Sequence, residues 1–452
     1  MSGSERASAA VATLGDAAIH RIRVETPDIN GCLRGKHVLA EKALGGKPLA
    51  FPEAYLALTL DDDMIDVPIG REESGFPDLF IDLDWDTLRL VPGEAGVAAV
   101  IGDGVRADRV RHPMHPRSVL RNVVDRAGAA GYEGVFGVEY EFWVFRADEA
   151  GQRARIDGDV AGMTRLSRTK QGYSLLRWSD HSEFATDLLE GMRSYGGVDI
   201  ETLLTEIGNG MLEAATAPAP ALVAADAAAR FKILARDVAR RHGLFVTFMA
   251  KLIPGEQGSS GHLHQSLLRN GKNVFWGGAP NSLSREGLSY AAGLMRVADE
   301  CGAIFAPFVN SYRRYAPGQF VPLEPSWGWD DRMSAVRAIT TEAKACRFEF
   351  RRPGADLNPY LAIAACLAGG VDAIQRGDDP GDPGARAAGH ELPNSLPDAV
   401  RRLRNSRVAK DWLGPAIVDL YVAGREQDQH TWNNHAAQNI PDWEIRRYFE
   451  EV

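Results

Sequence analysis

Two glutamates stand inside a strongly apolar segment. The segment Gly137–Phe145 reads GVEYEFWVF, and its aromatic and β-branched residues favour a β-strand. Because side chains alternate along a strand, Glu139 and Glu141 share a face with Trp143 and Phe145. Carboxylates buried among such neighbours need a cation, a metal ion or a proton. On its own, the segment fits a solvated edge strand and a functional site about equally well.

Residues with ligand chemistry recur at alternate positions in two further apolar segments. The letters HLHQS put His262, His264 and Ser266 on one face. The letters FEFRR do the same for Glu349 and Arg351. One such segment is weak support for a site, because an isolated buried histidine is more often structural. Three of them in one chain favour a shared site.

A glycine-containing segment, EIGNGMLEA, supplies two more acids, Glu206 and Glu213. Gly208 and Gly210 between them favour an irregular loop over a helix. Five carboxylates and one imidazole suit Mg²⁺ or Mn²⁺ better than zinc, and they suffice for two ions that also bind phosphate oxygens. The proposed ligands are Glu139, Glu141, Glu206, Glu213, His262 and Glu349.

Arginines gather in the C-terminal half of the chain, and guanidinium groups suit carboxylates and phosphates. Taken alone, each pair is more often a surface feature. Acids, arginines and glycine loops together indicate metal-assisted phosphoryl transfer. The glycine-rich GEQGSSGH lacks a following Lys-Ser/Thr pair, so it is not a P-loop. The arginines are Arg313, Arg314, Arg332, Arg337, Arg347, Arg351 and Arg352.

The composition narrows the class of protein. The chain has 452 residues and a net charge of −10, which argues against nucleic-acid and anionic-membrane partners. Its four cysteines are widely spaced, as in a reducing compartment. The N-terminus has no apolar signal region, and the longest apolar run, 360–374, is too short to span a membrane. We therefore expect a cytoplasmic protein.

Several elements must position these residues. Apolar patterning predicts strands over 135–145 and 244–254 and a helix over 224–243 that Gly243 closes. The polar stretch 146–172 is predicted as a loop that forms an insertion or lid. A domain boundary is expected near residues 105–115, at HPMHPR.

These motifs resemble those of the glutamine synthetase family. GVEYEFWVF is similar to the family's Gly-x-Glu-x-Glu-Phe strand, EIGNGMLEA to its second acid loop, and GSSGHLHQSL to its glycine–histidine strand. NSYRRYAPG, WDDRMSAVR and KACRFEFRRPGADLNPYLAIAACLAGG are similar to its arginine and final-acid blocks. The motifs run from about residue 132 to the end of the chain.

The resemblance implies an α+β fold with two domains. A small β-grasp-like N-terminal domain would cover residues 1–108, and a large catalytic domain residues 109–452. It also implies a homo-oligomer of two stacked hexameric rings, a dodecamer, with active sites between neighbouring subunits.

The resemblance also assigns roles to individual residues. One ion would take Glu141, Glu206 and Glu213, and the other Glu139, His262 and Glu349. The substrate glutamate would be bound by Arg314, Arg351 and the backbone of Gly258. Arg332 would stabilise the transferring charge, and Arg337 would face the phosphates. The nucleotide-binding site would be lined by His264, Ser266, Lys344 and Arg347.

Four residues bear on the choice of substrate. The family's flap carries a glutamate that helps bind and deprotonate ammonium, and Phe320 stands in its place in RYAPGQFVPLEP. Met211 and Gln257 replace a usual glutamine and asparagine, which leaves open whether the acid substrate is glutamate. Tyr173 matches a tyrosine near the amine. With these changes the chain resembles the branch of the family that makes γ-glutamylpolyamines and γ-glutamylalkylamides.

The resemblance thus implies an ATP-dependent ligase that joins L-glutamate to an organic amine through a γ-glutamyl phosphate, with two Mg²⁺ or Mn²⁺ ions. Arg332, Glu206 and Tyr173 would be catalytic. The amine's proton would go to Glu206 or to an acid of DDDMID, residues 61–66, from a neighbouring subunit. The alternatives are an ordinary glutamine synthetase that uses ammonia and a non-catalytic homologue that binds nucleotide.

Overall fold

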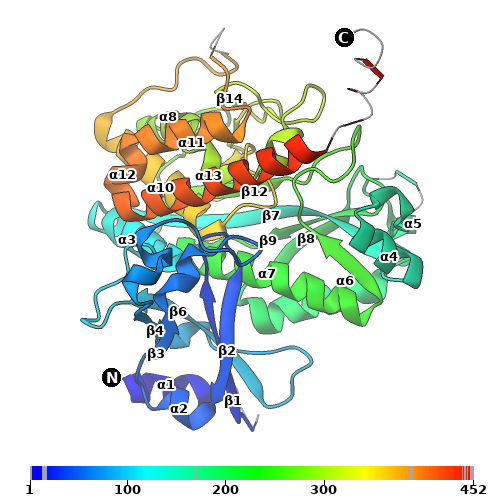
Figure 1. Ribbon diagram of the computed structural model, residues 1–452. Coiled ribbons are helices and arrows are strands. Elements are labelled where there is room, and N and C mark those ends of the chain that lie inside the picture. The colour runs from blue at the N-terminus through cyan, green and yellow to red at the C-terminus, as the bar shows by residue number, and fades with distance from the viewer. Residues whose placement is uncertain are drawn as a thin grey trace.

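The computed structural model describes residues 3–12, 18–167, 169–170, 172–385, 390–439, 441, 444 and 446–447. It contains two sheets, one in the N-terminal part of the chain and one that runs through the rest (Figure 1). The N-terminal sheet occupies the lower part of Figure 1, and the long helix α13 crosses the upper part. The expected α+β architecture with an N-terminal sheet domain is confirmed.

The N-terminal sheet has six strands in the order β2-β1-β6-β4-β3, and β5 pairs with β6. β1 pairs antiparallel with β2 and parallel with β6, which is the arrangement of a β-grasp sheet. Its strands are β1 (Arg21–Pro27), β2 (Leu33–Leu39), β3 (Leu49–Pro52), β4 (Asp78–Leu83), β5 (Arg89–Leu90) and β6 (Val97–Val105). The predicted boundary at 108/109 lies in the segment between β6 and α3 and stays a prediction.

The large sheet has ten strands in the order β14-β15-β16-β12-β7-β9-β8, with β10 and β11 paired to β7 and β13 to β12. Its central strand, β7, is the predicted strand lengthened at both ends. The strands are β7 (Glu133–Arg146), β8 (Ile200–Thr205), β9 (Met211–Thr216), β10 (Ala219–Pro220), β11 (Leu244–Thr247), β12 (Gly261–Arg269), β13 (Lys272–Asn273), β14 (Trp327–Trp329), β15 (Val336–Ile339) and β16 (Arg347–Phe350).

Helices pack around this sheet, and α10 lies among α3, α7 and α8. Asn358 caps α10 through its side chain, Pro359 opens it, and Gly377 ends it in the left-handed conformation. The helices are α1 (Gly3–Ala12), α2 (Ala40–Leu44), α3 (Pro116–Ala129), α4 (Glu149–Asp157), α5 (Leu175–Ser179), α6 (Ser182–Gly191), α7 (Ala221–Arg241), α8 (Arg285–Glu300), α9 (Gly302–Phe305), α10 (Pro359–Arg376), α11 (Leu396–Asn405), α12 (Arg407–Trp412) and α13 (Pro415–Gln438). The short helical turns are η1 (Glu53–Ala57), η2 (Pro68–Gly70), η3 (Glu72–Ser74), η4 (Trp85–Thr87), η5 (Val160–Gly162), η6 (Met192–Gly196) and η7 (Val309–Arg314).

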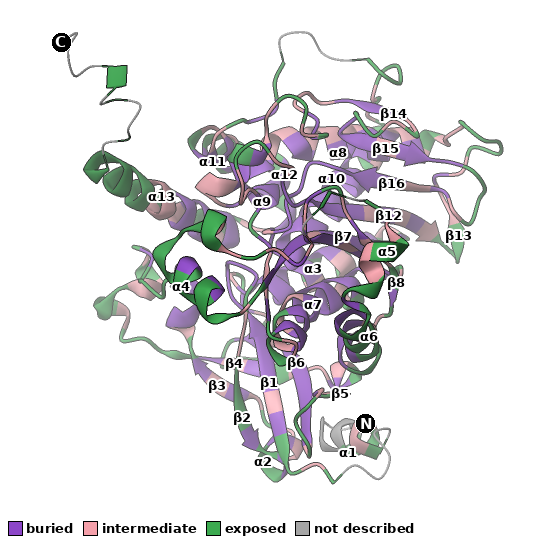
Figure 2. Cartoon of the chain, turned by 90° about the vertical axis from the view of Figure 1, so that its right-hand side faces the viewer, coloured by how far each residue is buried: buried purple, intermediate pink, exposed green. Residues whose placement is uncertain are grey.

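One face of β7 forms part of the apolar core. Tyr140 and Phe142 contact Phe231 of α7 with ring centroids 5.9 and 5.8 Å apart. Strands β7, β12, β15 and β16 are buried along most of their length, whereas α4 and α5 are largely exposed (Figure 2). Since side chains alternate, the glutamates of β7 lie on the opposite face from α7.

The predicted helix at 224–243 is confirmed as α7. The predicted strand at 244–254 is wrong beyond Thr247, because β11 ends there and Phe248 turns into the core beside Phe231. The predicted loop at 146–172 contains a helix, α4, with Asp148 as its N-cap and Gly158 as its C-cap. No helix within the described residues is long and apolar enough to cross a membrane.

A buried arginine joins the N-terminal sheet to the helices of the large domain. Arg117 of α3 is fully buried and donates to Asp226 of α7 at 2.8 and 2.9 Å, to Asp103 of β6 at 2.9 Å and to Asp84 at 2.7 Å. Burial opposes its charge, but the carboxylates of Asp226 and Asp103 hold the pKa of Arg117 well above its usual range. Removing the guanidinium would leave Asp226 without its paired arginine, and Asp84 and Asp103 with Arg121 alone.

We expect Arg117→Met to destabilise the fold by about 3–5 kcal/mol, because it leaves buried charges uncompensated. Arg121→Met is the matched control: Arg121 lies one turn further along α3, is 25% exposed and binds Asp84 and Asp103. It should cost about 1 kcal/mol, as a half-exposed pair does. The measurement is the urea midpoint of both variants, and equal losses would contradict the prediction.

Candidate active site

The strand register brings the predicted ligands, except Glu206 in the loop between β8 and β9, into one row across the large sheet. Residues directly opposite each other on neighbouring strands point to the same face, with Cβ atoms about 5 Å apart. The row runs over β9, β7, β12, β16 and β15. Its facing pairs are Glu213 and Glu141, Glu139 and His262, His264 and Glu349, and Glu349 and Arg337.

Three carboxylates form the first cluster of the row. Glu141, Glu206 and Glu213 offer oxygens that all lie within 4.8 Å of one another. The Ser260 N–H donates to Glu141 Oε2 at 2.6 Å. Burial and the charge of Glu206 raise the pKa of Glu141 to about 7. Burial and the charges of Glu139 and Glu141 raise the pKa of Glu213 to about 9. A divalent cation would relieve this repulsion.

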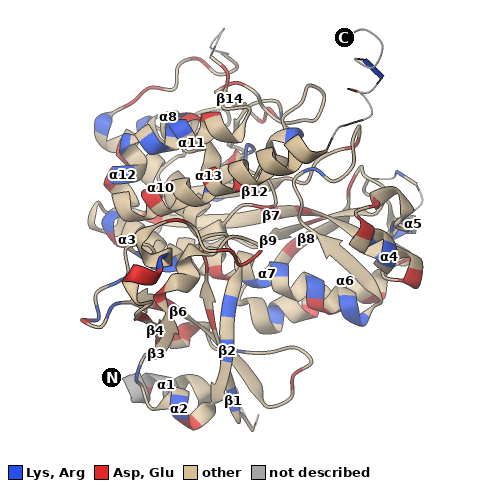
Figure 3. Ribbon diagram, in the orientation of Figure 1, with Lys and Arg blue, Asp and Glu red and all other residues tan. Residues whose placement is uncertain are grey.

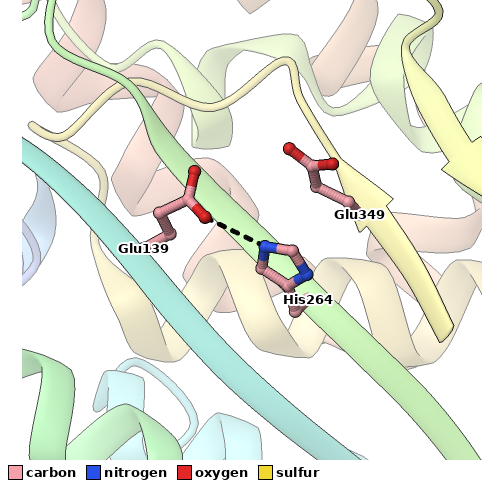
Figure 4. A group of neighbouring side chains, drawn as sticks. All are labelled: Glu139, His264 and Glu349. Atoms are coloured by element: carbon pink, nitrogen blue, oxygen red, sulfur yellow. Dashed lines mark hydrogen bonds and ion pairs between the residues drawn. The ribbon is translucent and has the colours of Figure 1, made fainter. Parts of the chain in front are cut away.

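The second cluster joins Glu139 to two imidazoles. His262 Nδ1 lies 2.7 Å from Glu139 Oε1, and His264 Nε2 lies 3.1 Å from Glu139 Oε2. Figure 4 shows Glu139, His264 and Glu349 reaching from three strands toward one another, and their ligand atoms lie within 4.8 Å. Burial would raise the pKa of Glu139, but the imidazole hydrogen bonds hold it well below its usual range. His264, predicted to line the nucleotide, is therefore also placed as a possible ligand.

The His262 ring tests whether this cluster fits a metal ion. Burial and the nearby Arg351 charge lower the pKa of His262, so its ring is neutral near pH 7. With Nδ1 donating to Glu139, the lone pair of a neutral ring lies on Nε2. His262 Nε2 is buried and has no hydrogen-bond partner among the described residues. A free imidazole nitrogen beside carboxylates fits a divalent cation.

Two arginines, Arg337 and Arg351, lie beside Glu349 near the end of the row. Arg337 Nη1 donates to Glu349 Oε2 at 2.7 Å, and Arg351 Nη1 donates to Glu349 Oε1. Arg351 Nε also donates to the carbonyl of Arg332 at 3.0 Å. Burial opposes ionisation, but His262 and Arg351 lower the pKa of Glu349. The structure thus brings the predicted arginines 332, 337 and 351 to the two clusters.

A polar cavity of about 260 Å³ opens over the row. Its wall includes Gly258, Arg332, Tyr173 and Phe320. Tyr173 and Phe320 are 73% and 53% exposed, and both have positive φ, +58° and +53°. Such backbone is strained for a bulky residue and is found at functional sites. The acids of the run DDDMID, residues 61–66, do not line this cavity within the described chain.

A second cavity, of about 870 Å³, adjoins the row at Glu139, Glu213 and His264. The predicted nucleotide residues Ser266, Lys344 and Arg347 line it together with His264, whereas Arg337 lines the smaller cavity. Lys272, Asn273 and Trp276 also line it, and sequence reasoning missed them. They lie in the segment after β12 that begins with β13, GKNVFWGG, where an isolated tryptophan gives no ligand signal.

Arg314 is the predicted residue that does not reach a cavity wall. It is 1% exposed, and its guanidinium donates to Ser260 Oγ at 2.9 Å and to the carbonyl of Arg352 at 2.9 Å. A Cβ on Gly258 would lie 2.7 Å from Arg314 Cγ, so the glycine lets this side chain pack beneath the loop. Its contact with a substrate carboxylate stays a prediction.

Trp276 offers the large aromatic face of the second cavity. If this cavity takes a purine nucleotide, we expect Trp276→Ala to raise the KM for ATP about tenfold, because one stacked base contributes about 1–3 kcal/mol. The metal requirement and the choice of amine should not change. Steady-state phosphate release against ATP concentration checks this, with Trp329→Ala, outside the cavity, as the control. An unchanged KM for ATP would contradict the prediction.

Comparison with known protein families places most of the chain in one family. Residues 113–448 match the glutamine synthetase catalytic domain. The chain is 33% identical over 446 residues to type-1 glutamine synthetase 2 of Dictyostelium discoideum, covering 95% of this chain and 84% of that protein. It is 32% identical to a glutamate–isopropylamine ligase of a Pseudomonas species, covering 96% of each. It is also 32% identical to a γ-glutamylethanolamide synthetase of Streptomyces coelicolor, covering 100% of this chain and 96% of that protein.

Solved structures agree at the level of the whole chain. A complex of GmaS with ADP superposes with a TM-score of 0.80 at 28% identity, covering 99% of this chain and 100% of that one. A glutamine synthase homologue superposes with a TM-score of 0.77 at 25% identity, covering 91% and 95%. With the acid row, the arginines and the matched domain, the chain belongs to the glutamine synthetase family of ATP-dependent carbon–nitrogen ligases.

Proposed function

We propose that this ligase joins L-glutamate to a small organic amine, with ATP as the energy source and a γ-glutamyl phosphate as the intermediate. The observation that carries the amine specificity is Phe320, an exposed aromatic side chain in the cavity wall where an acid is expected. Two of the relatives are named for organic amines, isopropylamine and ethanolamine, which supports the choice.

Two Mg²⁺ or Mn²⁺ ions would be held by the two clusters of the row. Glu141, Glu206 and Glu213 would hold one, and Glu139 with Glu349 and an imidazole would hold the other. His262 and His264 are both candidates for that imidazole, because each contacts Glu139. When bound, such ions neutralise phosphate charge during phosphoryl transfer.

In the first step the γ-carboxylate of glutamate attacks the terminal phosphorus of ATP, and ADP leaves. Arg332 and Arg337 line the cavity between the two clusters and would neutralise the charge that moves to the leaving group. Arg351, with the Gly258 backbone, would hold the glutamate. The flap that carries Phe320 would limit water, which otherwise hydrolyses the acyl phosphate.

In the second step the amine nitrogen forms the amide bond, and phosphate leaves. Phe320 and Tyr173 would pack against the carbon atoms of the amine, and an aromatic face also attracts an ammonium cation. The amine must lose a proton before it attacks, since its pKa is about 10 or higher. Glu206 lies in the same cavity and would accept this proton, or an acid of 61–66 from a neighbouring subunit would do so.

Such a neighbour belongs to the assembly that we propose, a dodecamer of two stacked hexameric rings. Several large apolar side chains are exposed on the single chain, including Leu175 and Leu176 beside Tyr173 and Leu60 and Met64 beside the acidic run. Light scattering measures the mass of the particle directly.

The experiment that tests the function is phosphate release with glutamate, ATP and Mg²⁺ or Mn²⁺ across a panel of amines. The panel contains ammonia, alkylamines, ethanolamine, polyamines and aromatic amines. We expect turnover with an organic amine at least tenfold faster than with ammonia. Ammonia as the best substrate would show an ordinary glutamine synthetase. Nucleotide binding without turnover on any amine would show a non-catalytic homologue.

A further inference from the structure

A single lysine contacts two loops that wall the active-site cavity. Lys251 lies in the segment after β11, and its Nζ donates to the carbonyl of Glu256 and, at 2.8 Å, to Gln319 Oε1. Glu256 belongs to residues 254–260, which we call the glycine loop, and Gln319 belongs to residues 316–321, which we call the flap tip. Both loops line the cavity of about 260 Å³ over the row of ligands. Lys251 therefore sets how these two walls lie relative to each other.

The flap tip is weakly held by hydrogen bonds. It lies in a stretch without helix or strand, between η7 and β14. The backbone N–H groups of Ala316 and Gln319 donate only to carbonyls two and three residues earlier. Within the described residues, the bond from Lys251 to Gln319 is the only hydrogen bond that joins the flap tip to another part of the chain. The position of the tip, and with it that of Phe320, therefore depends on Lys251.

The glycine loop, by contrast, is held from several sides. Glu256 Oε1 accepts from Arg165 Nη1 at 2.7 Å, and Ser259 is fully buried. Lys251 is itself fixed by a reciprocal pair with Asn310, whose Oδ1 accepts from the Lys251 N–H at 2.9 Å and whose Nδ2 donates to the Lys251 carbonyl at 2.7 Å. The lysine therefore joins the flap tip to a wall that is already held in place.

The chemistry of the contact also fits a positioning role. Basic and acidic residues intermix over the ribbon in Figure 3, but both acceptors of Lys251 are neutral oxygens, because the Glu256 carboxylate binds Arg165. Hydrogen bonds from a charged donor are stronger than those between neutral groups. Lys251 is half-buried, so water competes less for its ammonium than it would at an exposed site.

We propose that Lys251 is a positioning residue for the amine step, which holds the flap tip against the glycine loop through Gln319 while the acyl phosphate exists. Two reactions compete for this intermediate. Either the amine nitrogen attacks the γ-carbonyl carbon and breaks its bond to phosphate, or a water oxygen does so and returns glutamate and phosphate. The held flap keeps Phe320 in the cavity wall and limits water, so it favours the amide. This kinetic role rests on the proposed function, whereas the hold on the flap does not.

Kinetics on the full-length assembled enzyme test the role, with glutamate, ATP, Mg²⁺ and the best amine of the panel. Lys251→Met removes the ammonium and should raise the ratio of phosphate released to amide formed at least fivefold. The KM for ATP should stay within twofold, because neither loop lines the cavity of about 870 Å³. Gln319→Met removes the acceptor and should have the same effect, and the double variant should have no larger effect than either single one. Lys410→Met, at an exposed lysine of α12, is the control and should match the wild type.

Hydrogen–deuterium exchange without substrates tests the hold on the flap, and it gives an answer whichever acid and amine the enzyme uses. Exchange at residues 316–321 should be at least threefold faster in Lys251→Met and in Gln319→Met, and unchanged in Lys410→Met. Normal exchange in both variants would overturn the proposal. So would an unchanged ratio of phosphate to amide, or an effect of Lys251→Met that Gln319→Met does not share. If Lys251→Met does not fold, Gln319→Met decides, because it alters only a half-buried side chain of the flap tip.

Discussion

Replacing Glu213 with glutamine should lower the rate of phosphate release at least about 1000-fold, a loss of about 4 kcal/mol in transition-state stabilisation. Glu213 faces Glu141 across β7 and β9, and both share the first cluster with Glu206. Glutamine has nearly the same shape but no charge, so the fold should persist while a cation loses one of three ligands. The added stability that Mn²⁺ gives, measured as a shift of the unfolding temperature, should fall in parallel.

The control for this variant is Glu133→Gln, because Glu133 is an exposed glutamate at the start of β7. It should change neither turnover nor the Mn²⁺-induced shift. Full activity of Glu213→Gln would contradict the assignment of the first cluster as a metal site.

The stability of the metal-free protein should depend on pH because of Glu213 in the first cluster. Burial and neighbouring acids raise the pKa of Glu213 from 4.5 to about 9. A raised folded pKa means that the proton favours the folded state below pH 4.5, and that this advantage is lost as the pH rises to about 9. Metal-free wild type should therefore lose stability over this range, and Glu213→Gln should lose less. Thermal unfolding in a chelator at several pH values measures the difference.

The period of two along β7 was enough to predict that Glu139 and Glu141 share a face, but not whether that face is a solvated edge or a functional site. It did not reveal which strands flank β7, since pairing of β9 and β12 with β7 joins residues 68 to 135 positions apart. The motif resemblance supplied the missing partners, and the register then explains those that lie on strands; Glu206 lies in the loop between β8 and β9 and joins them from outside the register. His264 beside Glu139 follows from the same register and was foreseeable from its position two residues after His262.

Other features were beyond sequence reasoning or were misread. Arg314 is in a motif, but only packing under Gly258 shows that its guanidinium is used by Ser260 and a backbone carbonyl. The apolar run after Gly243 has no stop signal before Pro254, so the end of β11 at Thr247 was not predictable. The helix α4 was predictable, because Asp148 and Gly158 are ordinary cap residues.

Replacing Phe320 with glutamate should change the choice of amine. Phe320 lines the cavity over the two clusters, and its φ of +53° is about equally unfavourable for Phe and for Glu, so the swap alters chemistry more than backbone strain. A carboxylate at this place attracts ammonium and accepts its proton. The carbon atoms of a larger amine would instead contact a charged group, which is unfavourable.

We expect Phe320→Glu to raise kcat/KM for ammonia at least tenfold and to lower it for the best organic amine at least tenfold, so that their ratio shifts at least 100-fold. Phe320→Leu is the control, since it keeps an apolar wall and should keep the preference for the organic amine. The KM for ATP should stay the same in both variants, because Phe320 does not line the cavity of about 870 Å³ that we assign to the nucleotide. Parallel losses with every amine would mean that Phe320 supports the flap without selecting the substrate, and that the specificity lies with Tyr173 or with a neighbouring subunit.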